Sequence, residues 1–125
     1  MQIFRFGPTL GQSISQYESR NFVLARLLRL DETAVLSLVY LEPGGVIGHH
    51  AAIGDQLFLV LLGQGDVRGA AGNWQTVQPG QAVFWCDGEH HETRTEQGLT
   101  AIMVEGNRVD PTIYLQLMLD ENITR

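Results

Sequence analysis

The sequence predicts an all-β protein, and three observations lead to that class. Short runs rich in Val, Leu, Ile and Phe recur along the chain, glycines and prolines interrupt them, and their lengths suit strands better than helices. Several short strands at regular spacing are typical of a β-sandwich or barrel. With 125 residues and 44% apolar side chains, the chain can bury a substantial core, and we expect one domain over residues 1–125.

Four apolar runs are the predicted strands that form the centre of the fold: Ala34–Leu41, Gln56–Leu62, Ala82–Cys86 and Leu99–Val104. The run Gln56–Leu62 is apolar at nearly every position, which indicates a strand covered on both faces. One face can point into a barrel, and the other needs a second sheet or a second subunit. A homodimer is the simpler explanation in a chain this small.

Glycine-rich segments between the runs predict turns. Gly63–Asp66 directly follows an apolar run and predicts a tight hairpin, and further turns are expected at Ala71–Asn73 and Gln78–Gln81. Two segments remain open between helix and strand. Phe22–Leu30 fits either, and Ile113–Leu119 alternates loosely although Asp110-Pro111-Thr112 before it resembles a helix start.

Charge and cysteine content exclude several classes of protein. The net charge is −6 and the pI is near 5.0, which argues against a nucleic-acid partner because phosphate neutralisation requires a basic surface. The single cysteine, Cys86, excludes an internal disulfide and a cysteine-built zinc site. The start of the chain lacks the apolar run of a signal peptide, and no stretch reaches membrane-spanning length, so we expect a cytoplasmic protein with no membrane partner.

The four histidines form two adjacent pairs, His49-His50 and His90-His91, each preceded by glycines. On a regular strand, successive side chains point to opposite faces, so one histidine of each pair faces inward. Two inward imidazoles from separated strands can then converge, which is a common way to bind a transition metal. We expect His49 and His90 to face outward unless a bulge at a nearby glycine redirects one of them.

The spacing around the first pair resembles the first signature motif of the cupins, small β-barrels that typically carry a metal. In that motif a glycine is followed after five residues by histidine, then by a second histidine, a glutamate and a closing glycine. Gly44, His50 and Gly63 match these positions. Ala52 stands at the second histidine, and Gln56 stands at the glutamate.

The second cupin motif is similar to the segment around the second pair. Gly80, Gly88 and His91 match its glycines and histidine, whereas Cys86 replaces its proline and Thr95 replaces its asparagine. The resemblance covers about residues 34–105. It implies a double-stranded β-helix, also called a jelly-roll barrel, with its site inside the barrel.

Carried over residue by residue, the resemblance implies a metal centre at His50, His91 and Gln56. Gln56 offers an amide oxygen, a poorer ligand than a carboxylate, or it could instead hold a histidine tautomer through a hydrogen bond. The implied cofactor is a divalent transition metal, namely Zn, Ni, Cu, Mn or Fe. Aromatic side chains expected to line a ligand pocket are Phe58, Phe84 and Trp85, and Trp74 is expected in the core or a dimer face.

Three functions compete at this stage. One is a metal-dependent enzyme, for which isomerase and dioxygenase chemistry are both familiar in the family. Another is a module that binds a small organic acid or sugar without catalysis. The last is a dimerisation module with a metal-free site. No catalytic base other than the histidines is evident, and the catalytic residues stay unassigned.

Overall fold

The computed structural model describes residues 1–122 and confirms the all-β class. Its two main sheets are antiparallel. The larger has the strand order β12 (Gln116–Asp120), β1 (Gln2–Arg5), β9 (Gln81–Trp85), β6 (Asp55–Gly63), β11 (Leu99–Gly106) and β4 (Ala34–Leu41). The smaller has the order β5 (Val46–Ala51), β10 (His90–Arg94), β7 (Gly65–Arg68) and β8 (Gln75–Val77).

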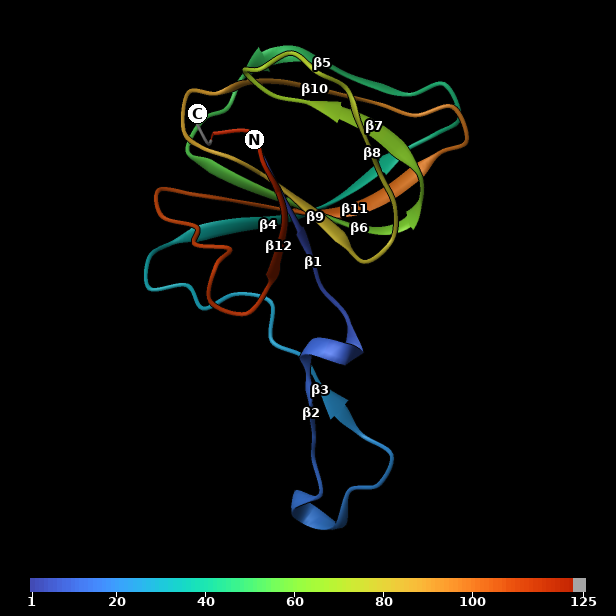
Figure 1. Ribbon diagram of the computed structural model, residues 1–125, viewed down its shortest axis with the longest axis vertical. Coiled ribbons are helices and arrows are strands. Elements are labelled where there is room, and N and C mark those ends of the chain that lie inside the picture. The colour runs from blue at the N-terminus through green and yellow to red at the C-terminus, as the bar shows by residue number, and fades with distance from the viewer. Residues whose placement is uncertain (123–125) are drawn as a thin grey trace.

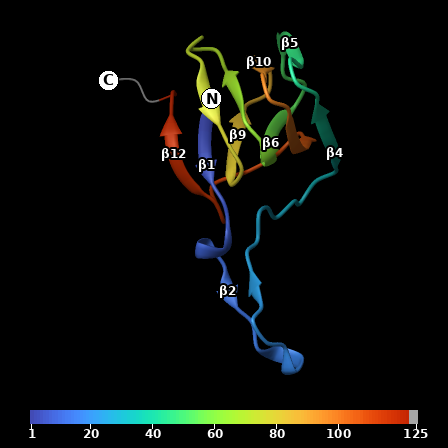
Figure 2. The same ribbon diagram turned by 90° about the vertical axis from the view of Figure 1, so that its right-hand side faces the viewer.

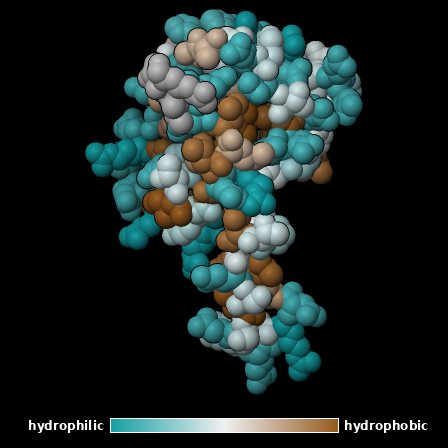
Figure 3. Space-filling view, in the orientation of Figure 1, coloured by the Kyte–Doolittle hydropathy of each residue, from teal (hydrophilic) through white to brown (hydrophobic). Residues whose placement is uncertain are grey.

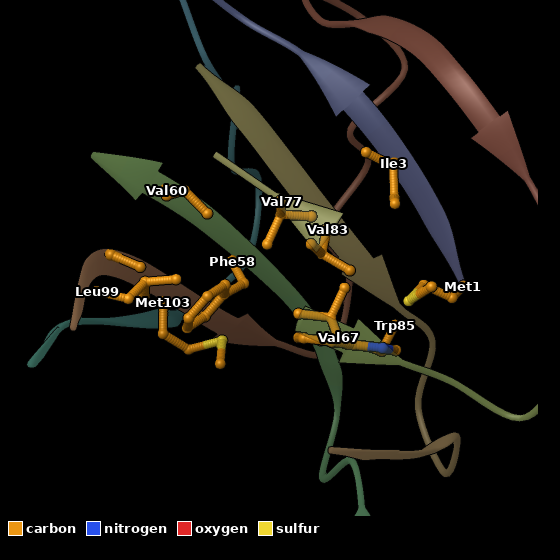
Figure 4. Close-up of a cluster of buried hydrophobic side chains, with 11 residues drawn as sticks. Met1, Ile3, Phe58, Val60, Val67, Val77, Val83, Trp85, Leu99 and Met103 are labelled. Atoms are coloured by element: carbon orange, nitrogen blue, oxygen red, sulfur yellow. The ribbon is translucent and has the colours of Figure 1, made fainter. Parts of the chain in front are cut away.

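The two sheets face each other and enclose the main core (Figure 1). Side chains from β6, β9 and β11 of the large sheet meet Val67 and Val77 of the small sheet. Phe58 and Trp85 are fully buried there, with ring centroids 6.0 Å apart (Figure 4). The four predicted apolar runs therefore coincide with β4, β6, β9 and β11, to within one or two residues at most ends.

Residues Gly63–Asp66 do not form the predicted hairpin. β6 pairs with β9 and β11, whereas β7 pairs with β8 and β10, so the chain changes sheets at this point. Gly63 has a φ of 80°, and a Cβ atom there would overlap the Gly98 carbonyl oxygen. The segment is a corner of the barrel. The turn expected at Ala71–Asn73 does connect a paired hairpin, β7 to β8.

The apolar run in β6 is covered on both faces by this chain alone. Leu57 and Leu59 point away from the barrel interior and are 0% and 1% exposed. They belong to a second cluster on the outer face of the large sheet, which residues 27–30 and 109–115 cover. The run itself therefore does not require a second subunit, since both of its faces are already packed.

Neither of the two segments that the sequence left open between helix and strand is helical. Phe22–Leu30 contains only the short strand β3 (Val23–Leu24), and Leu27, Leu28 and Leu30 then pack on the outer cluster as extended chain. Ile113–Leu119 begins in a turn and continues into β12, which pairs with β1. In both places, contacts with residues distant in sequence override any local helical preference: β12 pairs with β1, β3 pairs with β2, and Leu27, Leu28 and Leu30 pack on the large sheet.

Between β1 and β4 the chain leaves the body and returns. It passes through two short 3-10 turns (Pro8–Leu10 and Gln16–Glu18) and the small ladder of β2 (Gln12–Ser13) with β3. Figures 1 and 2 show this part projecting well beyond the two sheets in both views. We call residues 11–26 the arm. Among the described residues, the structure contains no helix that is long and apolar enough to cross a membrane.

Candidate functional site at the histidine end of the barrel

The structure brings His50 and His91 side by side. β5 and β10 are antiparallel neighbours, and His50 lies directly opposite His91 in their register. The centroids of the two imidazole rings are 4.5 Å apart. His91 also lies 4.2 Å from the Trp85 ring of the opposite sheet, so it points into the barrel. Two histidines that are 41 positions apart in sequence thus meet at one end of the core.

The other two histidines form a pair on the outside. The register between β5 and β10 shifts between His91 and Thr93, so β5 carries an extra residue near Gly48 and His49. Despite this bulge, His49 stacks on His90, with centroids 5.4 Å apart, and both are exposed. The irregularity does not bring either of them to His50 and His91.

Burial makes His91 a neutral imidazole at physiological pH. Its side chain is 2% exposed, and neither ring nitrogen has a hydrogen-bond partner. Loss of hydration, with a smaller contribution from the nearby His50, lowers the pKa of His91 from 6.5 to about 4. An uncharged imidazole retains a free lone pair, which is the form that binds metals or accepts a hydrogen bond.

His50 is exposed but held in one orientation. Its Nδ1 lies 2.6 Å from the Gly48 carbonyl oxygen, and a carbonyl can only accept, so in the neutral ring Nδ1 donates and Nε2 keeps the lone pair. Metal-binding histidines usually have one nitrogen tied in this way. The local chain supplies this contact because Gly48 and His50 lie two residues apart on the bulged strand.

Gln56 lies at the same end of the barrel, next to Trp85 in the β6–β9 register. Its Nε2 donates to Glu105 Oε1 at 3.3 Å, while its own Oε1 is buried without a partner. The indole Nε1 of Trp85 is also buried and unpartnered. Together with the two nitrogens of His91, these atoms form a set of buried polar groups whose hydrogen-bonding capacity is unused.

Glu105 is the residue of this region that sequence reasoning missed. It lies opposite Gln56 in the β6–β11 register and is exposed at the rim. Nothing in the local pattern marks it, because its proximity to Gln56 comes from strand pairing across 49 positions. Trp85 was expected only as pocket lining, whereas it directly contacts His91.

The predicted aromatic pocket is not assembled as expected. Phe58 and Trp85 face the interior, but Phe84 is on the opposite face of β9 and packs on the outer cluster. Strand alternation separates adjacent residues in this way. Trp74 is only partly buried, so it does not lie in the core as expected. The guanidinium groups of Arg68 and Arg94 lie 4.8 Å and 3.9 Å from its ring centroid and form cation–π contacts with it at the surface.

Other polar side chains near the two motifs make contacts within the fold. The Glu89 carboxylate accepts hydrogen bonds from the Met1 amino group at 2.8 Å and from the Ala70 amide at 3.0 Å. Burial and the nearby Glu89 carboxylate raise the pKa of the Cys86 thiol, which keeps it protonated. Thr95, at the position of the second-motif asparagine, donates to the Gln64 carbonyl oxygen at 2.6 Å and stabilises the Gly63–Asp66 corner.

The side chains at this end of the barrel could bind only a transition metal that accepts few protein ligands. Within residues 1–122, no three His, Cys, Asp or Glu side chains come together as metal ligands. Ala52 supplies no donor, so the candidate ligands at this end of the barrel are two imidazoles and the Gln56 amide oxygen. Two surface clefts of about 460 and 490 Å³ lie elsewhere and are not lined by any of the four histidines.

The fold and this site define a small antiparallel barrel with a histidine-bearing polar centre. The family model described as "Cupin domain" matches residues 37–105, which is more than half of the chain. The protein belongs to the cupin family, and its two facing sheets form the jelly-roll barrel of that family.

Solved structures agree at the level of the fold. A conserved protein of unknown function from Streptococcus pyogenes is 20% identical, with a TM-score of 0.56 over 72% of this chain and 78% of that one. A cupin superfamily protein from Desulfitobacterium hafniense is 19% identical, with a TM-score of 0.55 over 78% and 86%. A predicted oxalate decarboxylase from Thermotoga maritima is 22% identical, with a TM-score of 0.52 over 67% and 66%. A search of curated proteins found no match.

Proposed function

We propose that this protein binds one divalent transition metal ion through His50 and His91, with the Gln56 amide oxygen as a weaker third ligand. The observation that carries the proposal is the pair of imidazoles with ring centroids 4.5 Å apart, one fixed by Gly48 and the other buried with both nitrogens unpartnered. Burying an imidazole without a partner is costly, and a ligand at this place would remove that cost.

The kind of donor selects among metals. Imidazole nitrogens suit Zn, Cu and Ni, whereas Mn and redox iron sites generally use at least one carboxylate. The Glu105 carboxylate is hydrogen-bonded to Gln56 and exposed, and the Glu89 carboxylate is bound by the Met1 amino group and the Ala70 amide. We therefore favour Cu, Ni or Zn. A bound ion of this kind supplies Lewis acidity, and the chain's own residues supply its orientation and a partly dry setting.

Titration of the metal-free, untagged protein with Zn²⁺, Ni²⁺ and Cu²⁺ by isothermal calorimetry tests the proposal. We expect one ion per chain, and each of His50→Ala and His91→Ala should weaken binding by at least about tenfold. The outward pair provides matched controls, because His49→Ala and His90→Ala remove the same group from the same strands. Equal losses in all four variants, or no binding by the wild type, would refute the assignment.

A metal-free binding site for a small organic acid or sugar is the second candidate. It is favoured by the unpartnered Trp85 Nε1, which can only donate a hydrogen bond and cannot serve as a metal ligand. A thermal-shift screen of such compounds in the presence of a chelator measures this binding. Trp85→Phe should abolish a ligand-induced shift and leave metal affinity unchanged, whereas the metal proposal predicts no shift in chelator.

A further inference from the structure

One face of β4 carries apolar side chains that nothing in the described chain covers. Leu36, Leu38 and Tyr40 alternate along the strand and so share a face, and they are 63%, 56% and 70% exposed. Leu62 is 65% exposed. Leu62 and Tyr40 both pair with Thr100 of β11, so the three residues form one row across the sheet. We call the side chains of Leu36, Leu38, Tyr40 and Leu62 the β4 face. β4 is also an edge strand that pairs only with β11 within the described residues.

The β4 face is part of the outer face of the large sheet, which other segments of this chain cover nearer the centre of the sheet. Across the sheet, Leu38 is level with Ile102 and Leu59, and Leu59 is 1% exposed beneath the covering segments. The covering segments 27–30 and 109–115 therefore stop before the last strand. Long, apolar, unprotected edge strands are sites of association with another chain, and natural proteins normally cover or charge them.

The arm presents the complementary feature. Its apolar side chains are exposed, with Tyr17 96%, Phe22 41%, Val23 45% and Leu24 38% accessible. In Figure 3, brown apolar atoms extend from the body onto the projecting arm. A two-stranded ribbon of this size is at best marginally stable on its own. The arm therefore lacks a surface to pack against, and the β4 face lacks a cover.

We propose that a second copy of this chain supplies both, with the arm of each copy lying on the β4 face of the other. The arrangement is reciprocal, so the interface closes as a symmetric dimer. Charge supports this occupant. Glu32 and Glu42 flank β4, and residues 32–42 contain no Lys or Arg, while the arm carries Arg20 and Arg26 against a single acidic residue, Glu18. Opposite charges then approach each other at the rim of the contact.

The amount of exposed apolar surface also suits a dimer. Monomeric proteins rarely expose contiguous apolar patches beyond a few hundred Å². The four side chains of the β4 face and the four of the arm each expose more than a third of their surface. Side chains of that size approach the roughly 800 Å² per partner of a standard specific interface when both patches are buried.

The molar mass in solution, measured by light scattering and sedimentation, tests the proposal. The wild type should be a dimer at about 10 µM, and Leu38→Asp and Val23→Asp should each raise the dimer dissociation constant by at least about tenfold. Met118→Asp is the matched control, since Met118 is 52% exposed on β12 at the opposite edge of the same sheet. It should leave the dimer intact, and circular dichroism should show an unchanged fold in all variants.

Hydrogen exchange of the unmodified protein provides an independent readout if a variant fails to fold. Amides of residues 17–24 and 36–40 should become more protected as protein concentration rises. A wild-type monomer, protection that does not change with concentration, or a dimer that Val23→Asp leaves unaffected would overturn the proposal. A dimer lost equally in Met118→Asp would place the interface elsewhere and overturn it as well.

Discussion

His91 is held in its uncharged form by its surroundings at the end of the barrel. Its ring lies between the rings of His50 and Trp85, and no carboxylate or carbonyl accepts a hydrogen bond from it. Neutrality is an advantage for a ligand-binding histidine, because no proton has to leave before the lone pair is used. The same environment makes protonation unfavourable for the folded protein.

We predict that the metal-free protein loses stability as the pH falls from about 6.5 to about 4. The pKa of His91 is lower in the folded protein than its ordinary value of 6.5, so the unfolded chain binds the additional proton in this range. The effect should reach up to about 3 kcal/mol of unfolding free energy. Denaturant unfolding at a series of pH values measures it.

The control for this experiment is His91→Gln, which removes the titrating ring. Carboxylates also titrate at low pH, so the informative quantity is the difference between the two proteins. The unfolding free energy of the wild type minus that of His91→Gln should decrease as the pH falls below 6.5. Parallel pH profiles would show that His91 does not titrate with a lowered pKa.

Gln56 is the residue at which a single change should strengthen the proposed metal site. We predict that Gln56→Glu raises affinity for Zn²⁺ or Ni²⁺ by at least about tenfold, because an anionic carboxylate binds a divalent cation better than an amide oxygen. Isothermal calorimetry on metal-free protein measures the change. Gln56→Leu is the control and should weaken binding. Weaker binding in Gln56→Glu would mean that the side chain does not reach the ion.

At the scale of elements, the corner between β6 and β7 joins the two sheets. Gly63 takes a left-handed conformation directly against the Gly98 carbonyl, and Thr95 binds the Gln64 carbonyl oxygen beside it. Both strands that leave this corner contribute to the main core. A change in the corner is therefore transmitted to the relative position of the sheets.

We predict that Gly63→Ala destabilises the protein by at least about 2 kcal/mol, since it adds both an unfavourable backbone conformation and a steric overlap. Gly72→Ala is a matched control. Gly72 has a similar φ of 83°, but a Cβ atom there has nothing within 4 Å. It should cost about 1 kcal/mol, the backbone penalty alone. Equal losses in both variants, measured by denaturant unfolding, would contradict the role of the close contact.

Strand positions could be predicted from the sequence, but the connections between sheets could not. The runs that became β4, β6, β9 and β11 are apolar on the buried faces, and this pattern is local. The Gly63–Asp66 segment has the composition of a hairpin, yet its flanking strands pair with partners that are far away in the sequence. Loop composition specifies a bend, whereas strand pairing decides whether the bend closes a hairpin or changes sheets.

The candidate site shows the same division. Strand alternation predicted the pairing of His50 with His91, whose rings are 4.5 Å apart, but of the four histidines only His91 is buried, and His50 is exposed like His49 and His90. Alternation could not place Glu105 beside Gln56, because their proximity depends on the register of β6 with β11. Phe84 does not join Phe58 and Trp85 in the interior, since Phe84 and Trp85 are adjacent on a regular strand, and it lines the surface cleft of about 490 Å³ instead.

At the scale of the molecule, the jelly-roll barrel could be predicted because the glycine and histidine spacing resembles the cupin motifs over most of the core. The arm could not, because residues 11–26 have neither a clear period nor a recognisable motif. The inner face of the barrel buries its apolar side chains within one chain, but the outer face does so only as far as β11. Large exposed apolar side chains therefore lie on β4 and on the arm, and also at Leu117 and Met118 of β12, at the opposite edge of the large sheet.

We predict that the thermal midpoint of the wild type rises with protein concentration. A dimer is stabilised by mass action, whereas the midpoint of a two-state monomer does not depend on concentration. Scanning calorimetry between about 5 and about 500 µM should show an upward shift of several degrees, and Leu38→Asp should remove it. A wild-type midpoint that is independent of concentration would contradict a folded dimer in this range.

The contrasting environments of Trp74 and Trp85 give the protein two distinguishable fluorophores. Trp85 is fully buried, with its ring tilted by 38° relative to His91, whereas Trp74 is partly exposed beside two guanidinium groups. A Trp74→Phe protein would emit from Trp85 alone. Its intensity should then respond whenever the neighbouring imidazole gains a proton or a ligand, so occupancy could be followed optically without any attached dye.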